Sequence, residues 1–404
     1  MRTWRAAVGS ALVVALFAAA VQPTAGRGGG AAAVDNFTVG ALLDLKHGWT
    51  SLGRASRVTL QLAAADANAR LAKDGSAMRV RLRIVDVHGD PQASARALRR
   101  LAAAGVRVVI GPQASSEVGA LRATARPLGV VVISQGSTAH SLAVRGDNVF
   151  RFVPDDIRES EALVALLKRD GIDAVVPVWR NDSGNAGLAK AVRERVTRGG
   201  GSATKGVRYG TKVSDFAATL DQIRAQVDAL RTAGASRIAV YLAAFDEAAD
   251  LFDEASGDDR LGSLRWYGSD GAALTPRLTS DPKAAAFAAG VGYPNPILGL
   301  DDSAASKAKK LVARIQARLG HRPDAFALTA YDALQVAVDA RVRAGGAASD
   351  AQRLARALAR VAHGYVGVTG KLLLNAAGDR AYGSYDFWSV CTGAGSASWK
   401  RTWS

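Results

Sequence analysis

The stretch VVVISQGSTA, residues 130–139, joins an apolar run to a bed of small polar residues. Its first half is rich in β-branched side chains and is typical of a buried strand. Its second half offers hydroxyl groups and a glycine. The same layout occurs one predicted strand earlier, in VRVVIGPQASS, residues 106–116. Both stretches precede a helix, so the sequence places two small polar clusters at the ends of neighbouring strands.

Working outward from this stretch, strand and helix patterns alternate along the chain. In the first half we predict strands at 36–45, 79–87, 106–112 and 130–134, with helices at 56–71, 90–105 and 115–129 between them. The pattern restarts after 149–156. It then predicts strands at 173–179, 202–209, 237–243 and 264–271, and helices at 185–201, 213–234 and 245–256. Alternation with short connections predicts an α/β fold with parallel sheets covered by helices on both faces.

The remainder of the chain changes character. Residues 304–320 and 324–345 predict helices, and 368–390 predict strands around a Gly-Asp turn. A unit of this size cannot build its own core. We therefore expect it to complete the two preceding units, with the chain crossing between them more than once.

The two polar clusters lie where open parallel sheets bind ligands, beyond the carboxyl ends of the strands. Free N–H groups at helix starts, together with Ser and Thr hydroxyls, suit an anionic group such as a carboxylate or phosphate. The alternative is that Ser115, Ser137 and Thr138 merely cap their helices. Both interpretations stay open at this point.

The N-terminal 33 residues have the layout of a secretory signal peptide. Arg2 and Arg5 precede an apolar run from residue 6 to 21, and small residues at 18–20 and 31–34 offer cleavage sites. An anchor helix that stays attached is the alternative. Because Cys391 is the only cysteine, an intrachain disulfide, a thiolate zinc site and a lipid-modified N-terminal cysteine are excluded. We expect an exported, soluble protein without a lipid anchor.

The net charge of +16 would suit acidic ligands, nucleic acid or an anionic membrane. The arginines, however, are scattered over helical patterns and are not gathered with aromatic residues as in a single-strand binder. We favour compositional bias over a nucleic-acid function. The five histidines show no metal-ligand spacing, and the sequence contains neither G-x-S-x-G nor a phosphate-binding loop. We therefore predict a binding module with no metal, no cofactor and no catalysis.

The ordered segments VGALLDL, VIGPQASS, VVVISQGSTA, VFRFVPDD and FWSV resemble the type I periplasmic binding proteins, in the leucine/isoleucine/valine-binding branch of the substrate-binding proteins of ABC transporters. The resemblance runs from about Asn36 to Trp388. It implies two Rossmann-like lobes joined by three hinge crossings that close on a ligand. The lobes would comprise residues 36–154 plus about 292–382, and residues 155–291 plus about 383–404.

The resemblance also implies roles for individual residues. Ser115 would bind the α-carboxylate of an amino acid, helped by Gly136, Ser137 and Thr138, and the loop from Trp49 to Gly53 would cover the ligand side chain. Asp270, in YGSDG, would take the ammonium group, although an ordinary turn residue is the alternative. Tyr241 falls at a cleft position, with Phe245 close behind it. Where the family has an aromatic-Gly pair, Ser183 or Gly184 occupies the place in this chain, so that either one aromatic wall is missing or Trp179 replaces it from another angle.

These observations predict an exported, monomeric solute-binding protein in the periplasm. It would capture an amino acid or amide and deliver it to the membrane subunits of an ABC permease. The missing aromatic wall counts against leucine-like specificity. A ligand-sensing module of a receptor or signalling system with the same fold is the alternative, and an exported hydrolase is the third reading.

Overall fold

A computed structural model describes residues 34–345, 350–393 and 395–403. The predicted signal peptide, residues 1–33, lies outside the described residues. Within the described ranges, no helix combines the length and the apolar character needed to cross a membrane.

The first sheet contains five strands, all parallel, in the order β2-β1-β3-β4-β5. The strands and the segments between them are β1 Asp35–Leu43, α1 Thr50–Lys73, β2 Met78–Asp86, α2 Pro91–Ala103, β3 Val108–Ile110, α3 Ser115–Ala125, β4 Val131–Ser134, η1 His140–Leu142 and β5 Val149–Arg151. One face of this sheet packs on α1 and on two helices from late in the chain, α12 Ala325–Ala344 and α13 Ala351–Gly364. The other face packs on α2 and α3.

The second sheet is also parallel and has the order β10-β9-β6-β7, with β8 pairing β6 as well. Its elements are α4 Asp156–Arg169, β6 Ala174–Arg180, α5 Ser183–Arg198, β7 Ser202–Ala203, β8 Val207–Tyr209, α6 Ala217–Thr232, β9 Ile238–Ala243, α7 Ala248–Ala255, α8 Asp259–Gly262, β10 Arg265–Gly268, η2 Asp270–Ala272, α9 Pro276–Ser280 and α10 Pro282–Val291. Helices α4 and α5 cover one face, and α6, α7 and α10 cover the other.

The strand predicted over residues 202–209 is two short strands, because the chain turns at Gly206. Its φ of +85° is left-handed, and a Cβ there would lie 2.6 Å from the carbonyl oxygen of Pro177 and 2.4 Å from the Trp179 ring. Glycine alone tolerates both conditions. The pattern of apolar residues carried no sign of this break.

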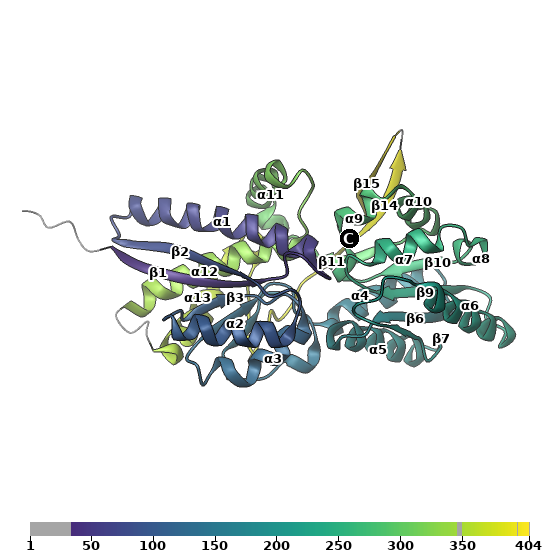
Figure 1. The fold of residues 1–404 in the computed structure, drawn as a ribbon, viewed down its shortest axis with the longest axis horizontal. Coiled ribbons are helices and arrows are strands. Elements are labelled where there is room, and N and C mark those ends of the chain that lie inside the picture. The colour runs from purple at the N-terminus through teal and green to yellow at the C-terminus, as the bar shows by residue number, and fades with distance from the viewer. Residues whose placement is uncertain (1–33, 346–349, 394, 404) are drawn as a thin grey trace, which may run out of the picture.

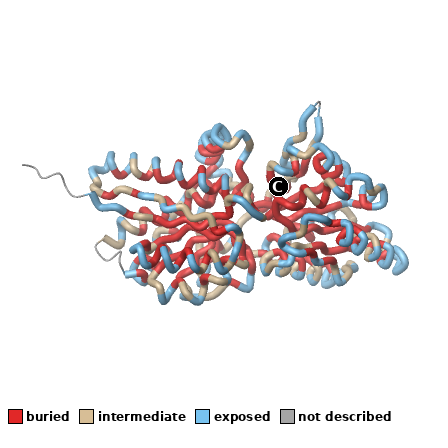
Figure 2. The backbone as a smooth tube through the Cα atoms, in the orientation of Figure 1, coloured by how far each residue is buried: buried red, intermediate tan, exposed pale blue. Residues whose placement is uncertain are grey.

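Figure 1 shows two lobes side by side, one around each parallel sheet, and Figure 2 shows that the buried residues concentrate along the two sheets and at their junction. The later elements are β11 Asn295–Leu298, η3 Asp302–Ala304, α11 Ala305–Leu319, β12 Val366–Gly367, β13 Gly370–Lys371, β14 Tyr385–Gly393 and β15 Ser396–Trp403. Helix α11 packs beside α1 in the first lobe, whereas β14 and β15 form a hairpin that projects from the second lobe. Strand β15 has no counterpart in the sequence prediction.

The chain passes between the lobes three times: before α4, after β11 and before β14. The passages touch one another, since a Cβ at Gly383 would lie 2.7 Å from Pro154 Cγ and 2.8 Å from Leu298 Cδ1. Strands β11 and β14 are also antiparallel neighbours. The α/β fold with two parallel sheets and three crossings is therefore confirmed. The residue limits proposed for the lobes stay a prediction.

Candidate ligand-binding site

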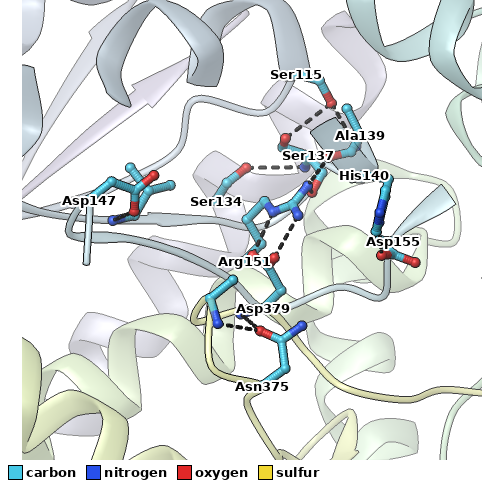
Figure 3. Close-up of polar contacts among 12 residues, drawn as sticks. Ser115, Ser134, Ser137, Ala139, His140, Asp147, Arg151, Asp155, Asn375 and Asp379 are labelled. Atoms are coloured by element: carbon cyan, nitrogen blue, oxygen red, sulfur yellow. Dashed lines mark hydrogen bonds and ion pairs between the residues drawn. The ribbon is translucent and has the colours of Figure 1, made fainter. Parts of the chain in front are cut away.

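The carboxyl ends of β3 and β4 bring the two polar clusters of the sequence together. Ser115 Oγ lies 3.0 Å from Ser137 Oγ, and the Ala139 N–H donates a 3.2 Å hydrogen bond to Ser115 Oγ. Figure 3 shows these groups at the start of α3 and in the loop after β4. The side chains of Ser115, Ser137 and Thr138 are buried. Thr138 also meets the second lobe, because its carbonyl accepts a 2.9 Å hydrogen bond from the Asp156 N–H and its side chain lies beside the carboxyl groups of Asp156 and Asp270.

Arg151 holds the loop after β4 in place. Its guanidinium forms two bonds to the Asp379 carboxylate, 2.6 Å from Nε and 2.7 Å from Nη2, and its Nη1 donates to the Ala139 carbonyl at 2.6 Å. Both side chains are almost fully buried, with 1% and 4% of their surface exposed. Figure 3 shows Arg151 beneath the hydroxyl cluster, with Asp379 on its other side. A residue from the last third of the chain thus positions the polar loop.

Glu117 fixes the start of α3 from inside the first lobe. It accepts hydrogen bonds from Ser94 Oγ at 2.9 Å and from the Ala114 N–H at 3.2 Å. Burial raises the pKa of Glu117 to about 8, more than these bonds lower it. The carboxyl group is therefore largely protonated in the folded protein at neutral pH.

This raised pKa makes stability depend on pH in a defined direction. The folded protein holds the Glu117 proton more tightly than the unfolded chain, whose pKa is near 4.5, so the stability contribution falls as pH rises from 4.5 towards 8. Glu117→Gln is neutral at every pH. Between pH 5 and pH 8, its free energy of unfolding should therefore fall by about 1–3 kcal/mol less than that of the wild type. Urea unfolding at both pH values measures this difference.

The exposed Glu194 offers the matched control, because Glu194→Gln removes the same charge without burial. It should leave the pH dependence of unfolding as it is in the wild type. Parallel pH curves for the wild type and Glu117→Gln would contradict the assignment of a raised pKa to Glu117.

Trp49 brings the two lobes into direct contact. It stacks on Phe245 of the second lobe, with ring centroids 4.2 Å apart and ring planes 9° from parallel. Next to this stack, the Ser51 N–H donates to Asp246 Oδ2 at 2.8 Å. The Trp49 loop is held by Gln113, whose Nε2 donates to the Trp49 carbonyl at 2.6 Å. The described state is thus a closed one, in which side chains of one lobe meet those of the other.

The remaining predicted residues occupy different environments. Gly136 is buried, and a Cβ there would lie 2.9 Å from Leu52 Cδ2. Tyr241, on β9, is fully buried, and its hydroxyl has no hydrogen-bond partner in the described ranges. Ser183 is exposed, while the neighbouring Gly184 faces the site, because a Cβ at that glycine would lie 3.2 Å from Ser115 Oγ.

The alternative aromatic wall, Trp179, packs its ring against Gly206 in the adjoining loop of the second lobe. A cavity of about 570 Å³ is lined by residues of both lobes, among them Trp49, Phe245 and Arg180.

Two acidic residues that the sequence reasoning missed lie beside Asp270. They are Asp156 and Glu159, both in the first turn of α4, and both are fully or almost fully buried. The Asp270 N–H donates to Glu159 Oε1 at 3.0 Å. The only signal in the sequence was the acidic run DDIRE directly after the first crossing, which also suits an ordinary helix start. We refer to Asp156, Glu159 and Asp270 as the acidic triad.

Burial dominates the electrostatics of the acidic triad. It raises the pKa of Asp156 to about 7, and it raises the pKa of Asp270 to about 6. The pKa of Glu159 lies well above its usual range, first because of burial and then because of the charge of Asp270. The triad therefore holds protons near neutral pH unless a cation is beside it.

The sequence of this chain is similar to those of known proteins. Over 369 residues the chain is 26% identical to an uncharacterized protein of Methanocaldococcus jannaschii, a match that spans 87% of this chain and 86% of that protein. Over 284 residues it is 26% identical to the Leu/Ile/Val-binding protein BraC3 of Rhizobium johnstonii, spanning 69% of this chain and 72% of the relative.

Solved structures share the fold. One is the branched-chain amino acid transporter substrate binding protein LivJ of Streptococcus pneumoniae in complex with isoleucine, with a TM-score of 0.74 and 20% identity over 91% of this chain and 100% of that one. Another is an ABC transporter solute binding protein of R. palustris in complex with benzoate, with a TM-score of 0.72 and 18% identity over 91% and 96% of the two chains. The sequence pattern described as "Periplasmic binding protein" matches residues 36–393, and the chain therefore belongs to the periplasmic binding protein family.

Proposed function

We propose that this protein is exported to the periplasm and works as a monomer. It captures a small amino-acid-like ligand between its lobes and delivers it to the membrane subunits of an ABC permease. One observation carries the proposal: the Ser115 and Ser137 hydroxyls of the first lobe form one buried cluster, and the neighbouring Thr138 lies beside the buried carboxyl group of Asp270 in the second lobe. The family is one of binding proteins, and the chain is not an enzyme.

The charges on the two sides of the site suit a zwitterion. Ser115 and Ser137 supply hydroxyl donors for a carboxylate, and Asp270 supplies an acceptor for an ammonium group. A benzoate-like acid, as bound by one structural neighbour, carries no cation to place against Asp270. Its charge would add to the buried negative charge of the acidic triad, which is unfavourable. An amine-bearing ligand is therefore the better fit.

The closed state explains how such a ligand would be trapped. A ligand with one charged end on each lobe binds the closed state more tightly than the open one, so it shifts the population towards closure. The Trp49–Phe245 stack and the bond from Ser51 to Asp246 join the lobes in that state. Because the three passages lie together at Gly383, we infer that the lobes close about this point as two rigid bodies.

The direct test is isothermal titration of the purified chain with the common amino acids and with benzoate. We expect saturable binding of an amino acid and no binding of benzoate. In Ser115→Ala the affinity for that amino acid should fall by about 10–100-fold, because a hydrogen bond to a charged group contributes about 1.5–3 kcal/mol.

Ser141, exposed in η1 of the same lobe, offers the matched control. Ser141→Ala should bind as the wild type does. Benzoate binding without amino-acid binding, or equal affinity of Ser115→Ala and the wild type, would refute the proposed ligand class.

A further inference from the structure

We propose that the acidic triad accepts two positive charges, so that the preferred ligand is a short amino acid with a second amino group. This inference rests on the proposed function and specifies its ligand class. A single α-ammonium group needs one carboxylate, and Asp270 supplies it. Asp156 and Glu159 are then two further acidic side chains at the same place.

The geometry of the triad supplies the argument. Asp156, Glu159 and Asp270 expose 3%, 0% and 8% of their surface. Each has a carboxyl oxygen, Asp156 Oδ1, Glu159 Oε2 and Asp270 Oδ2, that finds no hydrogen-bond partner among the described residues. The Tyr241 hydroxyl, from a different strand, is likewise buried and unpartnered over the same ranges. Burial raises the pKa of Tyr241, and the charges of the three carboxyl groups raise it further, which places the hydroxyl near all three.

The surrounding cations do not neutralise the triad. No Lys or Arg in the described part of the chain forms an ion pair with any of its three members. Arg151 lies near enough to Asp156 to lower its pKa, but its guanidinium is already bonded to Asp379 and to the Ala139 carbonyl. Buried carboxylates without a counter-charge are costly, so they must hold protons or meet a cationic ligand.

Bound protons neutralise the buried carboxylates of the acidic triad only in part. Glu159 holds a proton readily, because burial and then the charge of Asp270 raise its pKa well above the usual range. Two ammonium groups would replace that proton and neutralise a second carboxylate at neutral pH. The same charges make the site a poor match for a neutral side chain such as that of leucine.

The spacing of the triad limits the length of the ligand. Asp156 and Glu159 are three residues apart on α4 and therefore lie on the same helix face, about 5–6 Å apart at Cβ. Since the α-ammonium lies against Asp270, and the Asp270 N–H contacts Glu159 Oε1 at 3.0 Å, a short side chain is enough to bring the second amine to Glu159 and Asp156. We do not expect the triad to bind a divalent metal ion, because no group of side chains within the described residues is arranged to hold one.

The experiment compares matched pairs of probes by titration at pH 7.5. Each pair has the same carbon chain with and without the second amine: 2,4-diaminobutyrate with 2-aminobutyrate, ornithine with norvaline, and lysine with norleucine. In the wild type we expect the diamino member of at least one pair to bind about tenfold tighter or more. Calcium chloride, used as a cation without a carbon chain, should produce no saturable heat.

Glu159→Gln tests the role of the triad. Gln has the shape of protonated Glu, so the variant should fold, and a thermal melt of the free protein checks this. The affinity for the diamino member should fall at least about tenfold more than that for its partner. Asp156→Asn is a second test of the triad. The variant should keep α4 intact, because the helix is capped by Asp155. We expect the same loss of preference.

The outcomes separate this inference from the proposed function. If norvaline or norleucine binds as tightly as the diamino partner, the two-charge inference is wrong and the amino-acid function survives. The inference also fails if both variants keep the wild-type preference, or if calcium competes with ornithine. If no amino acid binds, the proposed function itself fails.

Discussion

Asp270→Asn is expected to weaken binding of the amino-acid ligand by about 100-fold or more at pH 7.5. The substitution keeps the size of the side chain but leaves the ligand ammonium buried without its negative partner, a loss of about 2–5 kcal/mol. Asp270 is buried in η2, where its N–H is bonded to Glu159 and its carboxyl group lies beside Thr138. Titration with the best ligand of the screen measures the loss.

The pH dependence of binding gives the same assignment a second test. Because the pKa of Asp270 is raised to about 6, acidification below pH 6 protonates the carboxylate and should weaken ammonium binding progressively. The affinity of Asp270→Asn should change less over the same range. Asp259→Asn, exposed at the start of α8, is the matched control and should bind as the wild type does. Unchanged affinity in Asp270→Asn would remove Asp270 from the site.

Asp379→Asn is expected to lower the free energy of unfolding by about 3–5 kcal/mol. The variant leaves the buried Arg151 guanidinium without its counter-charge, and breaking a buried ion pair from one side has this effect. Urea unfolding at pH 7 measures it. Since Arg151 also holds the Ala139 carbonyl, the ligand affinity of Asp379→Asn should fall as well.

The control is an exposed pair of the same chemistry. Arg314 also binds Asp66 through two bonds, of 2.7 and 2.8 Å, but the side chains are 45% and 31% exposed. Asp66→Asn should lose only about 0–1 kcal/mol. Combining Asp379→Asn with Arg151→Met should recover part of the lost stability, because the unpaired charge is then removed. If Asp379→Asn costs no more than Asp66→Asn, Arg151 and Asp379 do not hold the loop together.

Local sequence patterns carried most of the architecture. The β-branched runs at 106–110 and 130–134, with helical spacing between them, identify a parallel sheet because both signals depend on residues close in sequence. Exceptions occur where a distant partner decides the backbone. Gly206 breaks a predicted strand because Trp179 and Pro177 pack against it, and β15 forms because β14 offers it an edge.

The candidate site likewise contains residues that the local sequence predicts and residues that depend on distant segments. Ser115, Ser137 and Thr138 were predictable from their position, because the carboxyl ends of parallel strands share one edge of the sheet. Asp156 and Glu159 were not, because an acidic helix start looks the same whether it faces solvent or a closed cleft. The exposure of Ser183 and the approach of Gly184 to Ser115 likewise depend on how the lobes meet.

Periodicity and short-range order along the chain are enough to predict the α/β class, the two parallel sheets and the polar strand ends of the first lobe. The burial of Asp156, Glu159, Asp270 and Tyr241 beside one another, and the pairing of Arg151 with a residue 228 positions away, emerge only in the folded protein. The physical reason is that burial and electrostatic environment are set by segments that meet only after the chain has crossed between its lobes.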